Sequence, residues 1–256
     1  MKKVFTKKRI WVTVSILTMI ALWWILAETA FRRSLAVPAP PEVLRQMWIS
    51  AGTGALWLNS FNTLWKVFAA FLISLVLGFG AAVAAVKSVR VRYFISPIVT
   101  VVRAVPTMGV ILILFIIIRR PETAAIVIAV MMVFPMLYEG FYTSIKETDG
   151  QLLQMARVHK IPFNRRLTGI YAPHMAPYFF SSAAAGVGMC LKVVIAAEII
   201  GIPAANTIGT AMFNAQQILG QAGLIFMWVL VTVIIGFLLE ATIRGIGRAC
   251  MPWRKK

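Results

Sequence analysis

The chain has 256 residues, of which 60% are hydrophobic and only 13% are charged. Because a soluble domain is about 25% charged and less apolar, this composition excludes an ordinary soluble protein and indicates an integral membrane protein. The net charge of +18 does not indicate a nucleic-acid partner, since no basic patch interleaved with aromatic residues stands on a soluble segment.

Six uncharged apolar runs predict an all-α protein with six transmembrane helices. A bilayer-spanning helix needs about 20 mostly apolar residues, and the shorter runs reach this length with the polar residues beside them. The first run is longer than the apolar part of a secretory signal, about 7 to 15 residues, so we expect it to be retained. The runs cover residues 10–27, 67–86, 104–118, 123–138, 175–191 and 222–239.

The distribution of lysine and arginine predicts that both termini are cytoplasmic. With the N-terminus inside, the inner segments hold 18 of these residues, against 5 in the outer segments, as the positive-inside rule requires. The same excess of base favours anionic lipid headgroups as neighbours. The chain divides into an N-terminal helix with an outer segment (1–57), a membrane domain (58–245) and a basic cytoplasmic tail (246–256).

Prolines and charges predict the connections between the first four spans. The "PAPP" of residues 38–41 should be extended, and "PEVLRQMW" after it has the spacing of a short helix along the membrane surface. Residues 87–93, "KSVRVRY", should form a short basic inner loop. The third span, from about Ile95, should be kinked or broken near Pro106, and "RRPE" should form a tight outer turn.

The hydrophilic segment of residues 151–177 predicts a helix, a turn and a second helix on the cytoplasmic side. Since an exposed apolar helix face lowers solubility unless something covers it, we predict that this segment docks onto a partner; the alternative is a solvated loop. The apolar residues near one face of its first helix, which Pro162 ends, are Leu152, Leu153, Ala156 and Ile161.

After the fifth span, which should end near Gly201, an uncharged segment carries many amides. Unpaired amides are costly in hydrocarbon, so we predict an outer cap or a short helix tucked against the bundle. The amides either line an external mouth or satisfy the segment's own backbone. They include Asn206, Asn214, Gln216 and Gln217.

Residues 154–173 resemble the EAA loop of ABC importer permeases, whose pattern is E-A-A-x3-G-x9-I-x-L-P. Four further stretches resemble the family at the expected places: "NTLWKVFAAFLISLVLGF" at 62–79, "RAVPT" at 103–107, "FP" at 134–135 and "LKVVIAAEIIG" at 191–201. Over roughly residues 38–245 the chain resembles the permeases of the nitrate, sulfonate and taurine importers. The loop matches the pattern at Ala156, Ile170 and Pro173, and departs from it at Gln154, Met155 and Lys160.

The resemblance implies a type I ABC importer permease fold of the bacterial cytoplasmic (inner) membrane, with coupling helices between spans four and five. These helices would sit in a groove of separate ATPase subunits. An external solute-binding protein would deliver a small anion, such as a sulfonate, taurine or nitrate, to a permease homodimer that works by alternating access. The chain has no G-x4-G-K-[ST] motif, so ATP and Mg²⁺ would belong to the partner, and we expect no catalytic residue and no bound cofactor here.

The departures from the loop pattern predict local differences. Lys160 replaces the glycine that permits the turn between the coupling helices, so the turn is expected to move to Ile161 and Pro162. Ala156 would be the small residue that lets the loop approach the ATPase closely. The "FIIIRRPE" stretch replaces an aromatic and glycine cluster of the family, which changes the expected outer gate.

Ionisable side chains within the spans are functional candidates, because even a lenient scale assigns about 2.5 to 3.5 kcal/mol to a central charge. Pairing of Glu198 with Lys66 or Lys192, and of Glu139 with Arg103, would remove most of this cost. The alternative is contact with substrate, for which Arg103 or Lys192 would suit an anion. The candidates are Lys66, Arg103, Glu139, Lys192, Glu198 and Glu240.

The remaining polar groups suggest no metal site and no disulfide. His159 and His174 lack a third ligand nearby, and Cys190 and Cys250 stand 60 residues apart. Three other functions stay open on the sequence: a permease for a vitamin precursor of the thiamine-pyrimidine kind, a channel and a polytopic membrane enzyme. The enzyme would need acids or histidines clustered at a membrane face, and the eight acids are scattered.

Overall fold

The computed structural model describes residues 2–30, 37–148, 150–201, 206–218 and 220–251, which contain helices and no strand. The tail residues 252–256 and the outer Arg32 and Arg33 lie outside this part. The elements are α1 (Lys2–Thr29), α2 (Pro40–Gly52), α3 (Ala55–Lys87), α4 (Val89–Ala104), α5 (Thr107–Ile117), α6 (Pro121–Lys146), α7 (Gly150–Val158), α8 (Phe163–Arg166), the π-helix η1 (Leu167–Tyr171), α9 (Ala172–Ile200), α10 (Ile208–Gln217) and α11 (Ala222–Cys250).

The prediction of six spans is confirmed, with one span broken. Within the described residues, α1, α3, α6, α9 and α11 are long and apolar enough to cross a membrane, and α4 with α5 gives a sixth span that bends by 101°. The break falls at Val105 and Pro106, whose backbone is extended. This is the predicted position, because a proline disfavours helical backbone in the residue before it.

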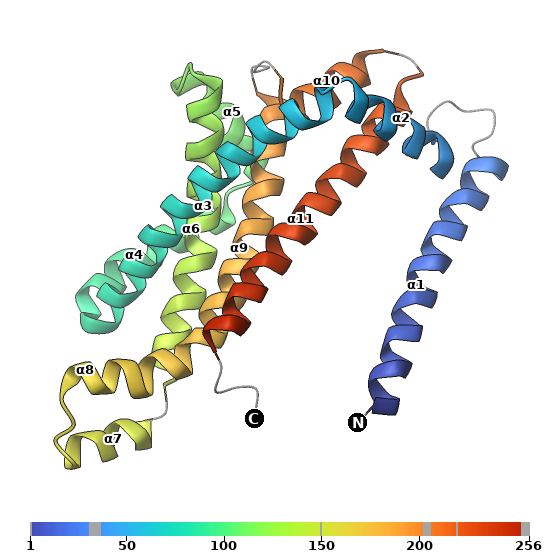
Figure 1. Ribbon diagram of the computed structural model, residues 1–256. Helices are drawn as coiled ribbons and strands as arrows, with labels where there is room; N and C mark the ends of the chain where they lie inside the picture. The colour runs from blue at the N-terminus through green and yellow to red at the C-terminus, as the bar shows by residue number, and fades with distance from the viewer. Residues whose placement is uncertain (1, 31–36, 149, 202–205, 219, 252–256) are drawn as a thin grey trace.

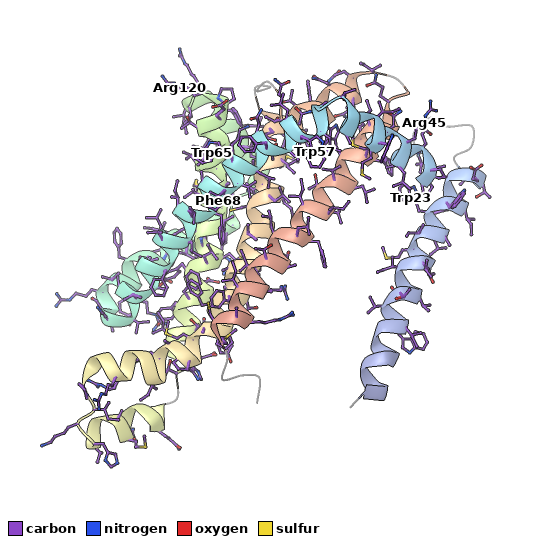
Figure 2. The ribbon with its side chains drawn as sticks, viewed as in Figure 1. Trp23, Arg45, Trp57, Trp65, Phe68 and Arg120 are labelled. Atoms are coloured by element: carbon purple, nitrogen blue, oxygen red, sulfur yellow. The ribbon has the colours of Figure 1, made fainter. Side chains whose placement is uncertain are left out.

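The bundle has one end with α2 and α10 and an opposite end with α7 and α8 (Figure 1). Helices α3, α6, α9 and α11 form its body, while most of α1 stands apart. Helix α1 joins the bundle through α2 and through the stacking of Trp23 on Phe226 of α11. The start of α1 and the end of α11 lie at the same end as α7 and α8 (Figure 1). Arg45 and Arg120, two predicted outer arginines, lie at the other end (Figure 2).

An aromatic stripe marks the surface of α3 that suits lipid. Trp57, Phe61, Trp65 and Phe68 recur at a spacing of three or four residues, and each is more than half exposed. Three of them are seen along the outer side of α3 (Figure 2). Tryptophan is enriched where a bilayer meets water, so this stripe fits the outer half of a span.

Two predicted connections are wrong in detail. Residues 87–93 do not form a loop, since Ser88 alone separates α3 from α4. The Arg92 guanidinium lies 5.3 Å from the centroid of the Tyr142 ring, a cation–π contact that favours helical packing over a solvated loop. Pro40 and Pro41 are not extended but form the first two residues of α2. Proline is tolerated there because the backbone N–H groups of the first turn have no acceptor within the helix, so the missing N–H costs nothing.

Glycines allow α6 to pack closely between its neighbours. Leu137 of α6 is fully buried, with Gly78 of α3 on one side and Gly186 of α9 on the other. At Gly140 a Cβ would overlap the Ser182 hydroxyl and would lie 2.9 Å from the Ser182 Cβ. Small residues let helix backbones approach in a membrane, where packing rather than hydrophobic burial holds helices together.

A buried polar network joins α3, α9 and the start of α10. Lys66 Nζ lies 2.8 Å from Glu198 Oε1, and both side chains are almost fully buried. Thr63 Oγ1 donates to Glu198 Oε2 at 3.0 Å, and the Gly209 N–H donates to the same oxygen at 3.1 Å. The carboxylate thus neutralises one buried cation and caps the positive end of α10.

The outer amide segment attaches to this network. Thr63 Oγ1 also accepts from the Ile208 N–H at 3.0 Å, and Asn62 Nδ2 donates to the Asn206 carbonyl at 2.9 Å. Of the expected polar residues, Asn214, Gln216 and Gln217 are exposed on α10. The predicted short helix against the bundle is therefore confirmed.

Removing one partner of the buried pair should be far more harmful than removing an exposed one. Lys66→Met leaves the Glu198 anion without its cation and should lower the free energy of unfolding by about 3 to 5 kcal/mol. Arg244→Gln, which breaks the exposed Arg244–Glu240 pair, should cost about 0 to 1 kcal/mol. Thermal unfolding of the purified variants in detergent checks the difference, and equal losses would contradict it.

The close contact of α6 with α9 predicts that two Gly→Ala substitutions change the stability in opposite directions. Gly140→Ala should destabilise by about 1 to 3 kcal/mol, because Ser182 must move. Gly80→Ala in α3, where nothing lies within 4 Å of a new Cβ, should instead stabilise by about 0.5 to 1 kcal/mol. The same unfolding assay measures both, and adding Ser182→Gly to Gly140→Ala should restore stability. A lack of rescue would refute this account.

Candidate functional site

Helix α6 carries a polar face in its second half. Glu139, Thr143 and Glu147 recur at intervals of four residues, which places them on one side of the helix. Met132 and Met136 extend the same side toward the other end of α6. Glu147 and Thr143 are exposed, and Glu139 is half-buried.

Helix α9 presents a matching stripe. Tyr178, Ser181, Ala185, Met189 and Lys192 recur at three or four residues, so they share one face of the helix. Tyr178, Ser181 and Lys192 are exposed, although most of α9 is buried. Ala185 and Met189 between them are half-buried. Exposed polar side chains at both ends of one face of an otherwise buried span indicate that this face meets water or another protein chain.

A partly polar pocket of about 610 Å³ lies between these two faces. Arg103, in the last turn of α4, reaches it from the break of the third span, and its guanidinium forms an ion pair with the Glu139 carboxylate. Both side chains keep about half of their surface exposed. The lining comprises Arg103, Met132, Met136, Glu139, Gly140, Thr143, Ser144, Glu147, Tyr178, Ser181, Ser182 and Met189.

Within the described residues, the intramembrane charges form three ion pairs and leave one lysine without an ion pair. Glu198 pairs with Lys66 and not with Lys192. Glu139 pairs with Arg103, as predicted, and Glu240 pairs with Arg244 one turn along α11 at 3.2 Å. Lys192 is exposed and has no ion pair with any residue of the described chain.

The residues of the EAA-like loop spread over α7, a turn and the start of α9. Gln154 and Met155 are exposed on α7, whereas Ala156 is fully buried. The side chain of Ala156 is thus covered within this chain, and its role in approach to a partner stays a prediction. Ile170 in η1 and Pro173 in α9 are half-buried. The side chains of Leu152 and Leu153 lie outside the described residues.

The turn between the coupling helices stays at Lys160, against our expectation. Lys160 has φ of +50°, the left-handed conformation that glycine adopts without strain. A helix ends at Val158 and the next begins at Phe163, so the left-handed residue of this turn stands at the position of the glycine in the family pattern. Pro162 follows the turn instead of making it.

Sequence reasoning missed the polar residues that line the pocket beside the charges. Thr143, Glu147, Tyr178, Ser181 and Ser182 were not singled out, because each is ordinary by itself. The signal was the spacing: polar residues at three or four positions within or beside apolar runs. Only the packing of α6 against α9 brings the two faces together.

Known proteins resemble this chain in sequence and in fold. The chain is 24% identical over 250 residues to the taurine transport system permease protein TauC of Escherichia coli K12, covering 94% of this chain and 90% of TauC. It is 20% identical over 235 residues to SsuC of Bacillus subtilis 168, named for transport of aliphatic sulfonates, covering 92% and 84%.

Solved structures share the fold. A permease chain of the MetNI methionine ABC transporter, described as inward facing, superimposes with a TM-score of 0.64 at 17% identity, covering 76% of this chain and 95% of that one. An amino acid ABC transporter gives 0.62 at 15% identity, covering 80% and 96%. The predicted ABC importer permease fold is therefore confirmed.

The sequence of the membrane domain decides the family. A model of the family described as binding-protein-dependent transport system inner membrane component matches residues 74–248. That range runs from the second span through α11 and includes the pocket, the loop of α7 and α8, and Lys192. The chain belongs to this family and is the permease component of an ABC importer.

Proposed function

We propose that this permease moves a small sulfonate-like anion, delivered by an external binding protein, along the face formed by α6 and α9. The observation that carries the proposal is the exposed polar stripe of α9, which ends in the unpaired Lys192. A lysine that faced lipid at this depth would cost about 2.5 to 3.5 kcal/mol. Facing a water-filled pathway, the same lysine is solvated and attracts anions.

The exposed stripe also supports a dimer. One chain leaves the polar faces of α6 and α9 open, whereas the aromatic stripe of α3 suits lipid. A second copy that covers the polar faces would enclose a pathway between the two chains and keep lipid out of it. The symmetric pairing of like surfaces is the commonest arrangement of soluble homo-oligomers, and a permease homodimer of this kind would supply two stripes to one pathway.

The docking site for the ATPase subunits is α7 with the turn after it. Met155 is 48% exposed and Val158 is 77% exposed, and they lie three residues apart on one side of α7. Helix α7, which carries these apolar side chains, lies at the end of the bundle opposite α2 and α10 (Figure 1). The charge distribution supports a cytoplasmic position for this end and for both termini, where ATP and Mg²⁺ would bind the partner and not this chain.

The substrate class follows from Lys192 and from the names of the relatives. Two similar permeases are named for taurine and for aliphatic sulfonates, which all carry a sulfonate anion. In this chain Lys192 stands about 4.5 Å along the helix axis from Met189 of the pocket, at 1.5 Å per residue. A sulfonate arriving from the outer end would therefore meet a free cation before it reached the pocket.

Energy would reach the pathway through α8, η1 and α9, which follow one another without a loop. Movement of the ATPase subunits would shift α7 and α8 and tilt α9, whose outer end is held by the Lys66–Glu198 pair. Alternating access would then open the pathway to one side at a time. Because its outer end is fixed, α9 would tilt about that end instead of moving as a whole.

Docking is tested by adding charge to the exposed side of α7. The double substitution Met155→Asp and Val158→Asp should abolish co-purification of the ATPase subunit, because two carboxylates would be buried in an apolar contact. The variant should keep the Tm of the isolated permease, since both side chains are exposed. Trp48→Asp, which changes an 81% exposed side chain on α2, is the control and should retain the ATPase. Retention by the α7 variant would refute docking there.

The pathway is tested separately at Lys192. Lys192→Gln should lower uptake of taurine into proteoliposomes holding the whole transporter by about tenfold, equivalent to about 1.4 kcal/mol of lost attraction. Lys192→Arg, which keeps the charge, should retain most of the taurine uptake. Lys87→Gln, which removes a charge at the far end of α3, should leave the uptake unchanged. The ATPase should still co-purify with Lys192→Gln. Full uptake of taurine by Lys192→Gln would refute the proposed role of Lys192 in the pathway.

A further inference from the structure

The pocket between α6 and α9 contains acids as well as a base, and this bears on what passes through it. Its lining holds two carboxylates, those of Glu139 and Glu147, and one guanidinium, that of Arg103. The formal charge of the lining is therefore −1. A simple sulfonate monoanion would meet net repulsion there, whereas a molecule that also carries an ammonium group would not.

We infer that this pocket binds the ammonium end of a zwitterionic substrate, so that the permease favours an aminoalkanesulfonate over a sulfonate without an amine. The inference rests on the proposed transport of sulfonates and narrows it to one chemical class. It assigns Glu139 and Glu147 to the ammonium group. Arg103 and the hydroxyl groups are assigned to the sulfonate oxygens.

The acids are available for this role. The Glu139 side chain is 45% exposed although it pairs with Arg103, so a second cation can approach its carboxylate. Glu147 is exposed, and the described residues offer its carboxylate no ion pair. Its backbone N–H donates to the Thr143 carbonyl at 2.9 Å, and its backbone carbonyl lies 3.1 Å from His174 Nε2. The buried Glu198 differs, because Lys66, Thr63 and the Gly209 N–H already occupy it.

The sulfonate end also has partners in the pocket. Ser181, Ser182 and Thr143 supply hydroxyl donors, and the Arg103 guanidinium presents several N–H groups in a fixed fork that suits an oxyanion. The volume of about 610 Å³ lies within the range of about 300 to 1,000 Å³ that small-molecule sites occupy. A short zwitterion can thus contact Arg103 and one of the two glutamates at the same time within the pocket.

The position of Lys192 sets the order of charged groups that a substrate would meet along the α6–α9 face. It lies beyond Met189, on the side of the pocket toward the outer end of α9, while Glu147 lies at the inner end of α6. Along this face the order is a free cation, then the Arg103–Glu139 pair, then a free acid. A zwitterion can exchange partners from one group to the next, whereas an anion without an amine has no favourable partner at Glu147.

Two probes of equal length isolate the ammonium group. Taurine and propane-1-sulfonate differ in that a methyl group replaces the ammonium. Their binding to the purified complex of permease and ATPase in nanodiscs, without the external binding protein, is measured by calorimetry. Taurine should bind at least about tenfold more tightly, the factor expected for one charge-assisted hydrogen bond.

The variants identify the groups responsible. Glu147→Gln and Glu139→Gln should each bring the ratio of the two affinities close to one, by weakening taurine and leaving propane-1-sulfonate unchanged or tighter. Glu122→Gln, an exposed acid in the first turn of the same helix, is the matched control and should keep the wild-type ratio. Glu147 is exposed, so its variant should fold even if Glu139→Gln disturbs the ion pair.

The outcomes separate this inference from the proposed function. Equal binding of the two probes, no binding of either, or an unchanged ratio in Glu147→Gln would overturn the inference. Sulfonate uptake by the whole transporter would persist in each of those cases if the proposed function is right. If the wild-type transporter took up no sulfonate at all, the proposed function itself would be refuted.

Discussion

The inability of hydrocarbon to form hydrogen bonds governs the placement of every polar group in this protein. A charge within the bilayer must be paired, or must face water or another chain. The structure uses these solutions in different places. Glu198 and Lys66 are paired out of reach of solvent, Arg103 and Glu139 are paired at the edge of a pocket, and Lys192 is exposed on a stripe of polar residues.

The two interhelical pairs differ in what they allow. Glu198 has each of its oxygens engaged by α3 or α10, so the first half of α3, the end of α9 and the start of α10 are held as one unit. Arg103 and Glu139 stay half exposed, and Arg103 stands beside the break at Pro106, where α4 and α5 meet at 101°. A fixed outer attachment and an open inner pair suit a helix bundle that must hold together while one end moves.

Close packing makes the pocket possible. Gly140 and Ser182 let α6 and α9 approach until no Cβ fits between them, and Leu137 fills the space that Gly78 and Gly186 leave. Gly140 and Ser182 themselves line the pocket, so their small size leaves room beside the helix contact. Elsewhere, on α7, Ala156 is fully buried within its own chain.

Much of this protein could be predicted from its sequence, since the hydrophobic effect acts on local composition. Apolar runs set the six spans, Pro106 set the break, and the spread of basic residues indicated which loops share a side. The motif around Ala156, Ile170 and Pro173 indicated the importer family. These features depend on residues near one another in the chain, so no tertiary contact is needed to recognise them.

The tertiary structure decided what depends on distant residues. Only packing selects Lys66 over Lys192 as the partner of Glu198, 132 positions apart in sequence. Only packing places Thr143 and Glu147 of α6 opposite Tyr178 and Ser181 of α9. Periodicity tells which residues share a face but not which faces meet, because the crossing of two helices is set by small residues on both. The spans are therefore a property of the sequence, and the pocket is a property of the fold.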